Sequence, residues 1–307
     1  MMSSLRKNIF KDFFSTFAFI IAFFFVISAF FCEIYSIYCK FNSITPIYEK
    51  GDIKNAYQAP SKMHLLGTDF KGRDVLVRAF FASKTAIKIG FLAGILSAFI
   101  GVITGIISAY FGGIVDELIV WLYSAFAAIP TLLFILSFSL LVTKGFLLPP
   151  FMNAFRFLSI LLNTDTGMLA IYIGIGMTGW VGLCRVIRAE TMRIKNEAYV
   201  KAARVLGYSD IKIIFRHILP NVFHIIIIYF SVRFSYAIMT EVIVSYLGLG
   251  VQSEPSWGVM IADGQLRLWR GIWWEITAAT GFMFLLVLSL NIIGDTIRDA
   301  LDPKLKF

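Results

Sequence analysis

Charged side chains inside a long apolar segment are the first residues of this sequence that could carry chemistry. Arg233 and Glu241 interrupt the apolar run between Pro220 and Gly248. A charge in the middle of a membrane costs about 2.5–3.5 kcal/mol on insertion scales, so such side chains usually face a cavity or a partner. On one helix these two residues lie about 80° apart around the axis, so a direct pair would be strained. We predict that both line a translocation path; a structural pair, or bonds to a partner subunit, is the alternative.

Residues suited to catalysis or metal binding are sparse. The chain has three histidines, and Pro220 lies between His217 and His224. Cys32 and Cys39 are more typical of side chains facing lipid or a helix than of metal ligands. A Walker A motif needs Gly-Lys followed by Ser or Thr, and the dipeptide Gly-Lys is absent from the sequence. We find no nucleophile with a base and an orienting residue, so we expect no enzyme, no metal site and no cofactor bound by this chain.

The composition around these residues is that of a membrane protein. Of the 307 residues, 58% are hydrophobic and 15% are charged, against about 45–50% and about 25% in ordinary globular chains. So many bulky apolar residues exclude extended disorder, and three cysteines exclude a disulfide scaffold. The net charge of +9 is best explained as membrane-flanking charge, because no basic-aromatic module for nucleic acid is present. The sequence therefore predicts an all-α polytopic membrane protein.

Windows free of charge predict six transmembrane helices. A helix needs about 20 predominantly apolar residues to cross roughly 30 Å of hydrocarbon. Asp116 and Glu117 alone separate the second window from the third, so we expect a hairpin closed by Gly112-Gly113. The windows are 13–32, 89–115, 118–143, 166–184, 276–294 and the run from Pro220 to Gly248.

Two segments allow other interpretations. The first window follows basic residues, as a signal peptide does, but its 20 apolar residues exceed the usual h-region of about 7–15, so we expect an uncleaved anchor. Residues 145–164 could form a seventh span, which would reverse the topology. Pro149-Pro150 and Arg156 favour instead a helix that lies at the membrane interface.

Four glycines in the second window share one helical face, because their spacings of 4, 7 and 4 residues keep them aligned. Small residues on one face let neighbouring membrane helices approach closely, although glycine is also common in membrane helices generally. We expect close helix packing at these positions: Gly90, Gly94, Gly101 and Gly105.

The charged segment 185–220 predicts two short helices joined by a turn. Gly207 stands where a left-handed residue closes a helix, and Asp210 can cap the second helix. Such a pair protruding from a membrane domain is a docking element for a soluble partner; an ordinary solvated loop is the alternative. Small side chains line one face of the first helix: Ala198, Ala202 and Ala203.

That segment resembles the signature cytoplasmic loop of binding-protein-dependent ABC importer permeases. The stretch EAYVKAARVLGYSDIKIIFRHILPN, Glu197 to Asn221, matches the family's Glu-Ala-Ala, Gly and Leu-Pro pattern. Lys201 stands where the family has Glu, and His217 where the general pattern has Ile. The Glu-to-Lys departure puts in doubt any specific contact of that side chain, but not the docking role. The family's ATPase-coupling residues correspond here to Glu197, Ala198, Lys201, Ala202, Ala203, Gly207, Leu219 and Pro220.

Three further segments are similar to the dipeptide, oligopeptide and nickel branch of that family, in its second-permease-subunit type. They occur in the family's order, so together with the loop they cover most of residues 64–306. The second of them, 246–264, appears one residue shorter before Pro255 than the commoner form. The segments are LGTDFKGRD (66–74), YLGLGVQSEPSWGVMIADG (246–264) and GDTIRDALDPKLK (294–306).

The resemblance implies a subunit of an ATP-driven importer in the bacterial inner membrane. Its partners would be a homologous second permease, two ATP-binding cassette subunits that use ATP and Mg, a periplasmic substrate-binding protein, and membrane lipid, with no nucleic acid. The resemblance also divides the chain into an N-terminal transmembrane helix with the start of a periplasmic loop (1–60) and a permease domain (61–307). Core helices then cover about 85–297 and the coupling loop 185–220.

Orientation and cargo are only partly determined. Lys and Arg number 14 on the side of the termini and 13 on the other. The denser short basic segments, which weigh most in the positive-inside rule, favour cytoplasmic termini and a cytoplasmic 185–219. We expect di- or oligopeptides as cargo. Nickel or a nickel chelate is the alternative, and an ion-gradient-driven transporter is disfavoured because no internal repeat is found.

Overall fold

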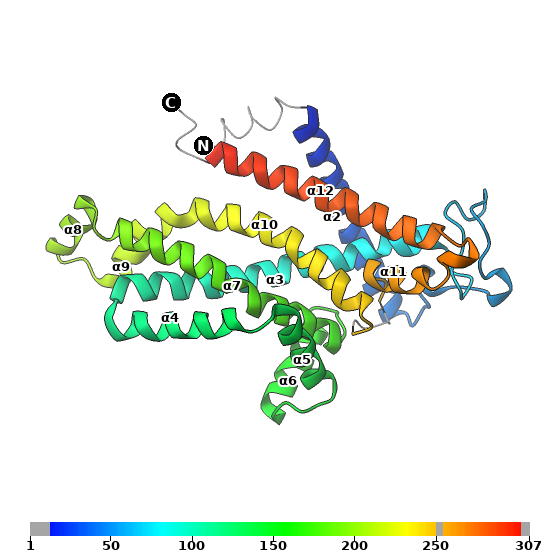
Figure 1. The fold of residues 1–307 in the computed structure, drawn as a ribbon, viewed down its shortest axis with the longest axis horizontal. Helices are drawn as coiled ribbons and strands as arrows, with labels where there is room; N and C mark the ends of the chain where they lie inside the picture. Colours follow the sequence, from blue (N-terminus) through cyan, green and yellow to red (C-terminus); the bar gives the residue numbers. More distant parts are fainter. Residues whose placement is uncertain (1–12, 250–253, 302–307) are drawn as a thin grey trace.

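The structure is a computed structural model that describes residues 13–249 and 254–301 (Figure 1). Within those ranges the regular elements are helices, and the only β-type pairings are two isolated bridges, Gly51 to Arg73 and Thr68 to Asp74. Five helices are long and apolar enough to cross a membrane. These are α2 (Phe13–Phe41), α3 (Val75–Phe111), α7 (Thr166–Ile194), the helical run Asp210–Tyr246 that ends in α10 (Leu219–Tyr246), and α12 (Trp274–Leu301).

A sixth crossing is made by two helices with a sharp bend between them. α4 (Gly113–Ala128) and α5 (Thr131–Thr143) together pass the same length and hydropathy test, but they meet at 91°. The fold class is confirmed: the chain is an all-helical, multi-pass membrane protein with five long apolar helices and this bent pair.

The bend corrects the prediction of one straight span over 118–143. Pro130 lies inside that window, and a proline disfavours helical backbone at the residue before it. Ile129 accordingly has an extended conformation, with φ −86° and ψ 126°, and ends α4. α5 therefore leaves the direction of α4 and projects to one side of the molecule (Figure 1).

The hairpin between the second and third windows is confirmed. α3 ends at Phe111 and α4 begins at Gly113, and both Gly112 (φ 70°) and Gly113 (φ 54°) have the positive φ that favours glycine. α3 begins earlier than its charge-free window, at Val75, because Asp74 caps it by accepting a hydrogen bond from the Val77 N–H.

α3 lies at the centre of the bundle and packs against both α7 and α10. The four glycines of α3 allow this close packing, but two of them face α10 and the other two face α7. A Cβ at Gly94 would lie 2.8 Å from the Phe230 ring of α10, and one at Gly105 would lie 2.8 Å from the Cys184 carbonyl of α7. The predicted close packing is therefore present, with Gly90 and Gly94 facing α10 and Gly101 and Gly105 facing α7.

Shorter helices complete the fold. α6 (Pro149–Leu161) has 13 residues, too few to cross the bilayer, so residues 145–164 do not form a seventh span. The others are η1 (Ile47–Glu49), η2 (Ile53–Asn55), α8 (Ala198–Val205), α9 (Asp210–Ile213), the π-helical η3 (Ile214–Ile218), α11 (Trp257–Gln265) and η4 (Leu268–Arg270).

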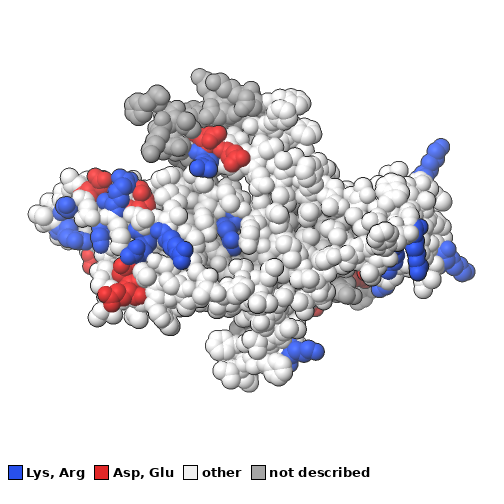
Figure 2. All heavy atoms as spheres, in the orientation of Figure 1, with Lys and Arg blue, Asp and Glu red and all other residues white. Residues whose placement is uncertain are grey.

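The molecule has two polar ends and an apolar middle. On the face shown in Figure 2, Lys and Arg gather mainly at the two ends, whereas Asp and Glu are visible mainly at one end and over the last part of α12. One end carries α8 and α9, and the other carries α11 and residues 42–74 (Figure 1); we call them the α8 end and the α11 end. The Ser15 and Thr296 hydroxyls are hydrogen-bonded at 3.2 Å, so the start of α2 lies beside the last part of α12.

Candidate functional site

The predicted helix stop at Gly207 is present and has the full geometry of a Schellman motif. α8 ends at Val205, and Gly207 has a φ of 78°. The Tyr208 N–H donates to the Ala203 carbonyl at 3.1 Å and the Gly207 N–H to the Arg204 carbonyl at 3.0 Å. These two bonds satisfy carbonyls at the end of α8 and reverse the chain toward α9.

The α8–α9 helix pair has a buried base. Val200 (1% exposed) and Ala203 (5%) of α8, together with Ile213 of α9, pack into one apolar cluster with Ile106 of α3 and Ile187 of α7. Buried apolar side chains on both helices fix the pair to the ends of the long helices, so it is a folded protrusion and not a solvated loop.

The outer side of the pair carries large apolar side chains that none of the described residues covers. Val205 is 88% exposed and Leu206 is 75% exposed, at the tip beside Gly207. Large exposed apolar side chains among charged ones are typical of a protein-interaction site. Three further apolar side chains of the segment are also exposed: Tyr199, Ile211 and Phe215.

The predicted coupling residues fall into two groups. Those from Glu197 to Gly207 lie together on the protrusion: Glu197 precedes α8 and accepts from Arg193 at 3.2 Å, and Ala203 is buried. Leu219 and Pro220 instead begin α10, behind the π-helical η3. Pro220 lies in the first turn of α10, where a missing N–H is tolerated. Exposed on the protrusion are Ala198, Lys201, Ala202 and Gly207.

The prediction that Asp210 caps α9 is wrong. Ser209 is the residue before α9, and Asp210 is already its first helical residue. The Asp210 carboxylate is engaged elsewhere, because its Oδ1 accepts a hydrogen bond from the Tyr110 hydroxyl of α3 at 2.6 Å.

Arg233 and Glu241 do not form a pair and lie in different surroundings. The Arg233 guanidinium stacks over the Tyr236 ring at 4.6 Å and lies against Gly179 of α7. Within the described ranges it makes no ion pair with a carboxylate. Arg233 is thus a half-buried cation within a span, without an acidic neighbour.

Glu241 is fully enclosed. Its side chain is 1% exposed, and its Oε1 accepts hydrogen bonds from Ser245 at 2.6 Å and from Ser256 at 2.7 Å. Ser256 also caps α11 by accepting from the Gly258 N–H. In this conformation Glu241 joins the end of α10 to the start of α11, and its role in a translocation path stays a prediction.

The segment LGTDFKGRD is organised around one buried carboxylate. Asp69 Oδ1 accepts from the Lys71 and Arg73 N–H groups, at 2.8 and 2.9 Å, while Oδ2 lies 2.7 Å from Arg78 of α3. Arg78 in turn lies 3.5 Å from Glu275 at the start of α12. The motif therefore fixes the beginning of α3 to the beginning of α12.

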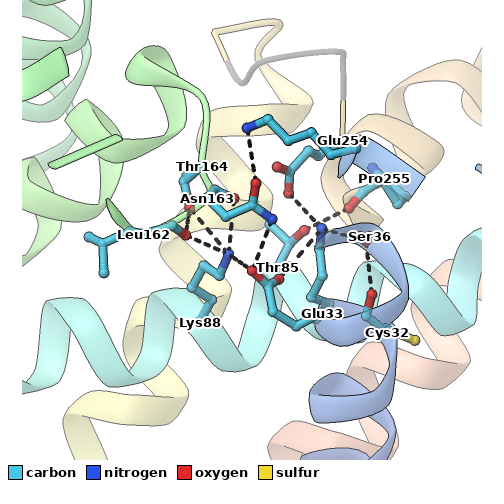
Figure 3. A network of polar contacts seen from close by, with 12 residues as sticks. Cys32, Glu33, Ser36, Thr85, Lys88, Leu162, Asn163, Thr164, Glu254 and Pro255 are labelled. Carbon is cyan, nitrogen blue, oxygen red and sulfur yellow. Dashed lines mark hydrogen bonds and ion pairs between the residues drawn. The ribbon is translucent and has the colours of Figure 1, made fainter. Parts of the chain in front are cut away.

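A second buried polar cluster at the α11 end was not foreseen from the sequence (Figure 3). Lys84, with a side chain only 2% exposed, lies 3.2 Å from Glu254 and 3.8 Å from Glu33 of α2. Lys88, one turn further along α3, donates to Glu33 at 2.9 Å and to the Leu162 carbonyl at 3.0 Å. Two lysines of α3 thereby join α2, the turn before α7 and the segment before α11.

The structure gives no support for a metal centre in the part of the chain that it describes, where no group of three or more His, Cys, Asp or Glu could hold an ion. Cys32 and Cys39 are buried at 3% and 2% exposure, so they face neighbouring helices. His217 packs against the rings of Tyr199 and Tyr208.

Comparison with known proteins agrees with this architecture. The chain is 38% identical over 245 residues to the oligopeptide transport system permease protein OppC of Escherichia coli K12, covering 78% of this chain and 72% of that protein. The identity is 33% over 260 residues with OppC of Bacillus subtilis, covering 84% and 78%. It is 32% over 248 residues with the dipeptide transport system permease protein DppC of the same organism, covering 80% and 71%.

A family match covers the part of the bundle that follows the middle of α3, including the α8–α9 pair. Residues 101–307 match the family described as binding-protein-dependent transport system inner membrane component. The match begins within α3 and includes every element from α4 onward. Together with the coverage of the relatives, it shows that this chain belongs to the family of inner membrane components of binding-protein-dependent transport systems.

Proposed function

We propose that this chain is a permease subunit of an ATP-driven importer of di- or oligopeptides. Relatives with 32–38% identity carry the names oligopeptide and dipeptide transport system permease protein. Nickel or a nickel chelate remains the alternative cargo. The described residues contain no cluster of metal-ligating side chains that would favour it.

The partners follow from the family and from the surfaces that the chain leaves uncovered. We place it in the bacterial inner membrane beside a homologous second permease, above two ATP-binding cassette subunits and beneath a periplasmic binding protein. ATP and Mg belong to the ATPase subunits, and this chain binds no cofactor. The α8 end and both termini lie on the cytoplasmic side, since the dense basic segments favour that orientation.

The observation that carries this proposal is the exposed apolar tip of a folded protrusion. Val205 and Leu206 are 88% and 75% exposed, while Val200 and Ala203 of the same helix are buried in the base. A helix held rigidly on one side and apolar on the other suits insertion into a groove of a soluble subunit.

The proposed mechanism is transfer of movement from the ATPase subunits to the membrane helices. When ATP closes the ATPase dimer, the α8–α9 pair moves with the groove that holds it. The base cluster of the pair includes residues of α3, α7 and α10. Movement of the pair therefore changes the tilt of those helices, which alternates access between the two sides of the membrane.

Arg233 is our candidate for a substrate contact. A cation within a span faces a cavity or a partner, and the guanidinium has no carboxylate beside it in the described structure. A peptide carboxylate would supply the missing anion in a bidentate geometry that suits arginine. A carboxylate of the second permease would do the same.

Uptake by a deletion strain tests the proposal. The strain is supplied with the wild-type gene or with Gly207→Asp, and labelled dipeptides and labelled nickel are offered in parallel. We expect dipeptide uptake with the wild type, and loss of it with the variant at equal protein level. If the wild-type gene rescues nickel uptake alone, the cargo is nickel and not peptide. Full uptake by Gly207→Asp would contradict coupling through this helix pair.

A further inference from the structure

The end of α3 makes a directed contact with the α8–α9 pair that the docking surface does not require. The Tyr110 hydroxyl, one residue before the end of α3, donates to Asp210 Oδ1 at 2.6 Å. Asp210 is the first residue of α9. This hydrogen bond therefore connects a membrane-spanning helix directly to the second helix of the protrusion.

Tyr110 also contacts the first helix of the pair. The Arg204 guanidinium of α8 lies over the Tyr110 ring, 5.5 Å from its centroid. Tyr110 itself is 6% exposed, and its ring packs in the cluster that contains Val200 and Ile213. One side chain of α3 is thus in contact with both α8 and α9.

The same end of α3 is fastened to α7. Two nitrogens of the Arg188 guanidinium, Nε and Nη2, donate to the Asp116 carboxylate at 2.6 Å each, and Ser108 of α3 also donates to that carboxylate. Lys195, just after α7, donates to the Ala109 carbonyl. The turn between α3 and α4 is therefore held on one side by α7 and on the other by the α8–α9 pair.

The contact faces the base of the protrusion and not its tip. Val205 and Leu206, which carry the proposed docking, are 88% and 75% exposed, whereas Tyr110 is buried beneath the pair. Loss of the Tyr110 hydroxyl would therefore leave the docking surface intact. It would remove a hydrogen bond to a carboxylate, which is stronger and more directional than apolar contact alone.

We infer that Tyr110 is a positioning residue that transmits movement of the α8–α9 pair to α3 and α4. The inference rests on the proposed function. The apolar base holds the pair to the bundle through non-directional contacts, which do not by themselves specify one register. The hydroxyl–carboxylate bond sets the register between α9 and the end of α3. A displacement of the α8–α9 pair then displaces the α3–α4 hairpin together with it.

The test compares transport with ATP hydrolysis in the assembled importer. The full complex, with its ATPase subunits and second permease, is reconstituted in proteoliposomes with the binding protein and a labelled dipeptide. Two rates are measured, peptide uptake and ATP hydrolysis, and their ratio is the coupling. For Tyr110→Phe we expect ATP hydrolysis within about twofold of the wild type and a ratio lowered about tenfold or more, as for loss of a hydrogen bond to a charged group.

Tyr208→Phe is the matched control. Tyr208 lies in the turn between α8 and α9 and its ring packs against His217 and Lys212, but its hydroxyl makes no hydrogen bond with the described residues. The ratio for this control should equal that of the wild type. Asp210→Asn, which keeps an oxygen acceptor, should retain more coupling than Asp210→Ala.

A double-variant cycle separates a direct contact from two independent defects. If the hydroxyl and the carboxylate act as one unit, Tyr110→Phe combined with Asp210→Ala is no worse than Asp210→Ala alone. Additive losses, an unchanged ratio in Tyr110→Phe, or a Tyr110→Phe chain that fails to copurify with its partners would overturn the inference. Absence of ATP-dependent dipeptide uptake by the wild type would instead contradict the proposed function, so the two failures are distinct.

Discussion

The Glu241 carboxylate accepts a hydrogen bond from the Ser256 hydroxyl at 2.7 Å, and Ser256 is the residue that caps α11. The same carboxylate oxygen accepts from Ser245 at 2.6 Å. A single buried oxygen thus fixes the end of α10, the start of α11 and the rotamers of two serines. Substitutions at these positions can separate a role in holding helices from a role in binding charge.

For Glu241→Gln we expect little loss of stability, and for Glu241→Ala a loss of about 2 kcal/mol or more. Gln keeps an oxygen that both serine hydroxyls can reach, whereas Ala leaves buried polar groups unsatisfied. Thermal unfolding of the purified protein in detergent measures both. Equal losses in the two variants would show that the charge itself, and not the acceptor, holds α10 to α11.

For Lys84→Met we expect a loss of about 3–5 kcal/mol, because removing one member of a buried ion pair leaves uncompensated charge. Glu254 and Glu33 lie 3.2 and 3.8 Å from Lys84, whose side chain is 2% exposed. Lys54→Met, at an exposed lysine of the same end, is the control. If the Lys84 variant is as stable as this control, the cluster does not contribute to holding α2 against α3.

For Leu206→Asp we expect the permease to fold but to bind its ATPase subunits about tenfold more weakly or worse, since a charge in the centre of an apolar interface removes a dominant contact. Leu206 is 75% exposed, so the fold does not need it. Copurification of the subunits with the tagged permease provides the measurement. Leu266→Asp, an equally exposed leucine (73%) at the α11 end, should copurify normally.

For Gly207→Ala we expect a loss of about 1 kcal/mol in the stability of the helix pair and reduced peptide uptake, because Gly207 has a left-handed backbone. Gly207→Asn should be tolerated better, since Asn adopts this conformation more readily. A Cβ added at Gly207 would meet no other atom within 4 Å, so the substitution tests backbone strain and not a steric clash. Gly271→Ala, with a φ of 79° and open space at the α11 end, should strain the backbone equally and leave uptake unchanged.

Turns and helix ends that need a glycine with positive φ were predictable from the sequence. Gly112-Gly113 closes the α3–α4 hairpin and Gly207 ends α8, as expected, because only glycine adopts positive φ at low cost. The shared face of the four α3 glycines was also predicted from their spacing. The spacing alone could not reveal that this face packs against both α7 and α10. The bend at Pro130 carried a visible signal, since a proline inside an apolar window ends a helix at the residue before it.

The buried polar contacts could not be predicted in the same way. Lys84 pairs with Glu254, which lies far away in the sequence, and Tyr110 bonds to a residue 100 positions later. Such partners are fixed by how the helices pack and not by spacing along the chain. Asp210 illustrates this: its position before a helix suggested a cap, but the nearby α3 hydroxyl supplies its partner instead.

The 91° turn between α4 and α5 directs α5 away from the upright helices, so α5 and α6 project sideways from the bundle (Figure 1). The outline of the protein in the plane of the membrane is therefore uneven. Any neighbour that packs on this side of the bundle must fit around the projection, which restricts the orientations in which the two can meet.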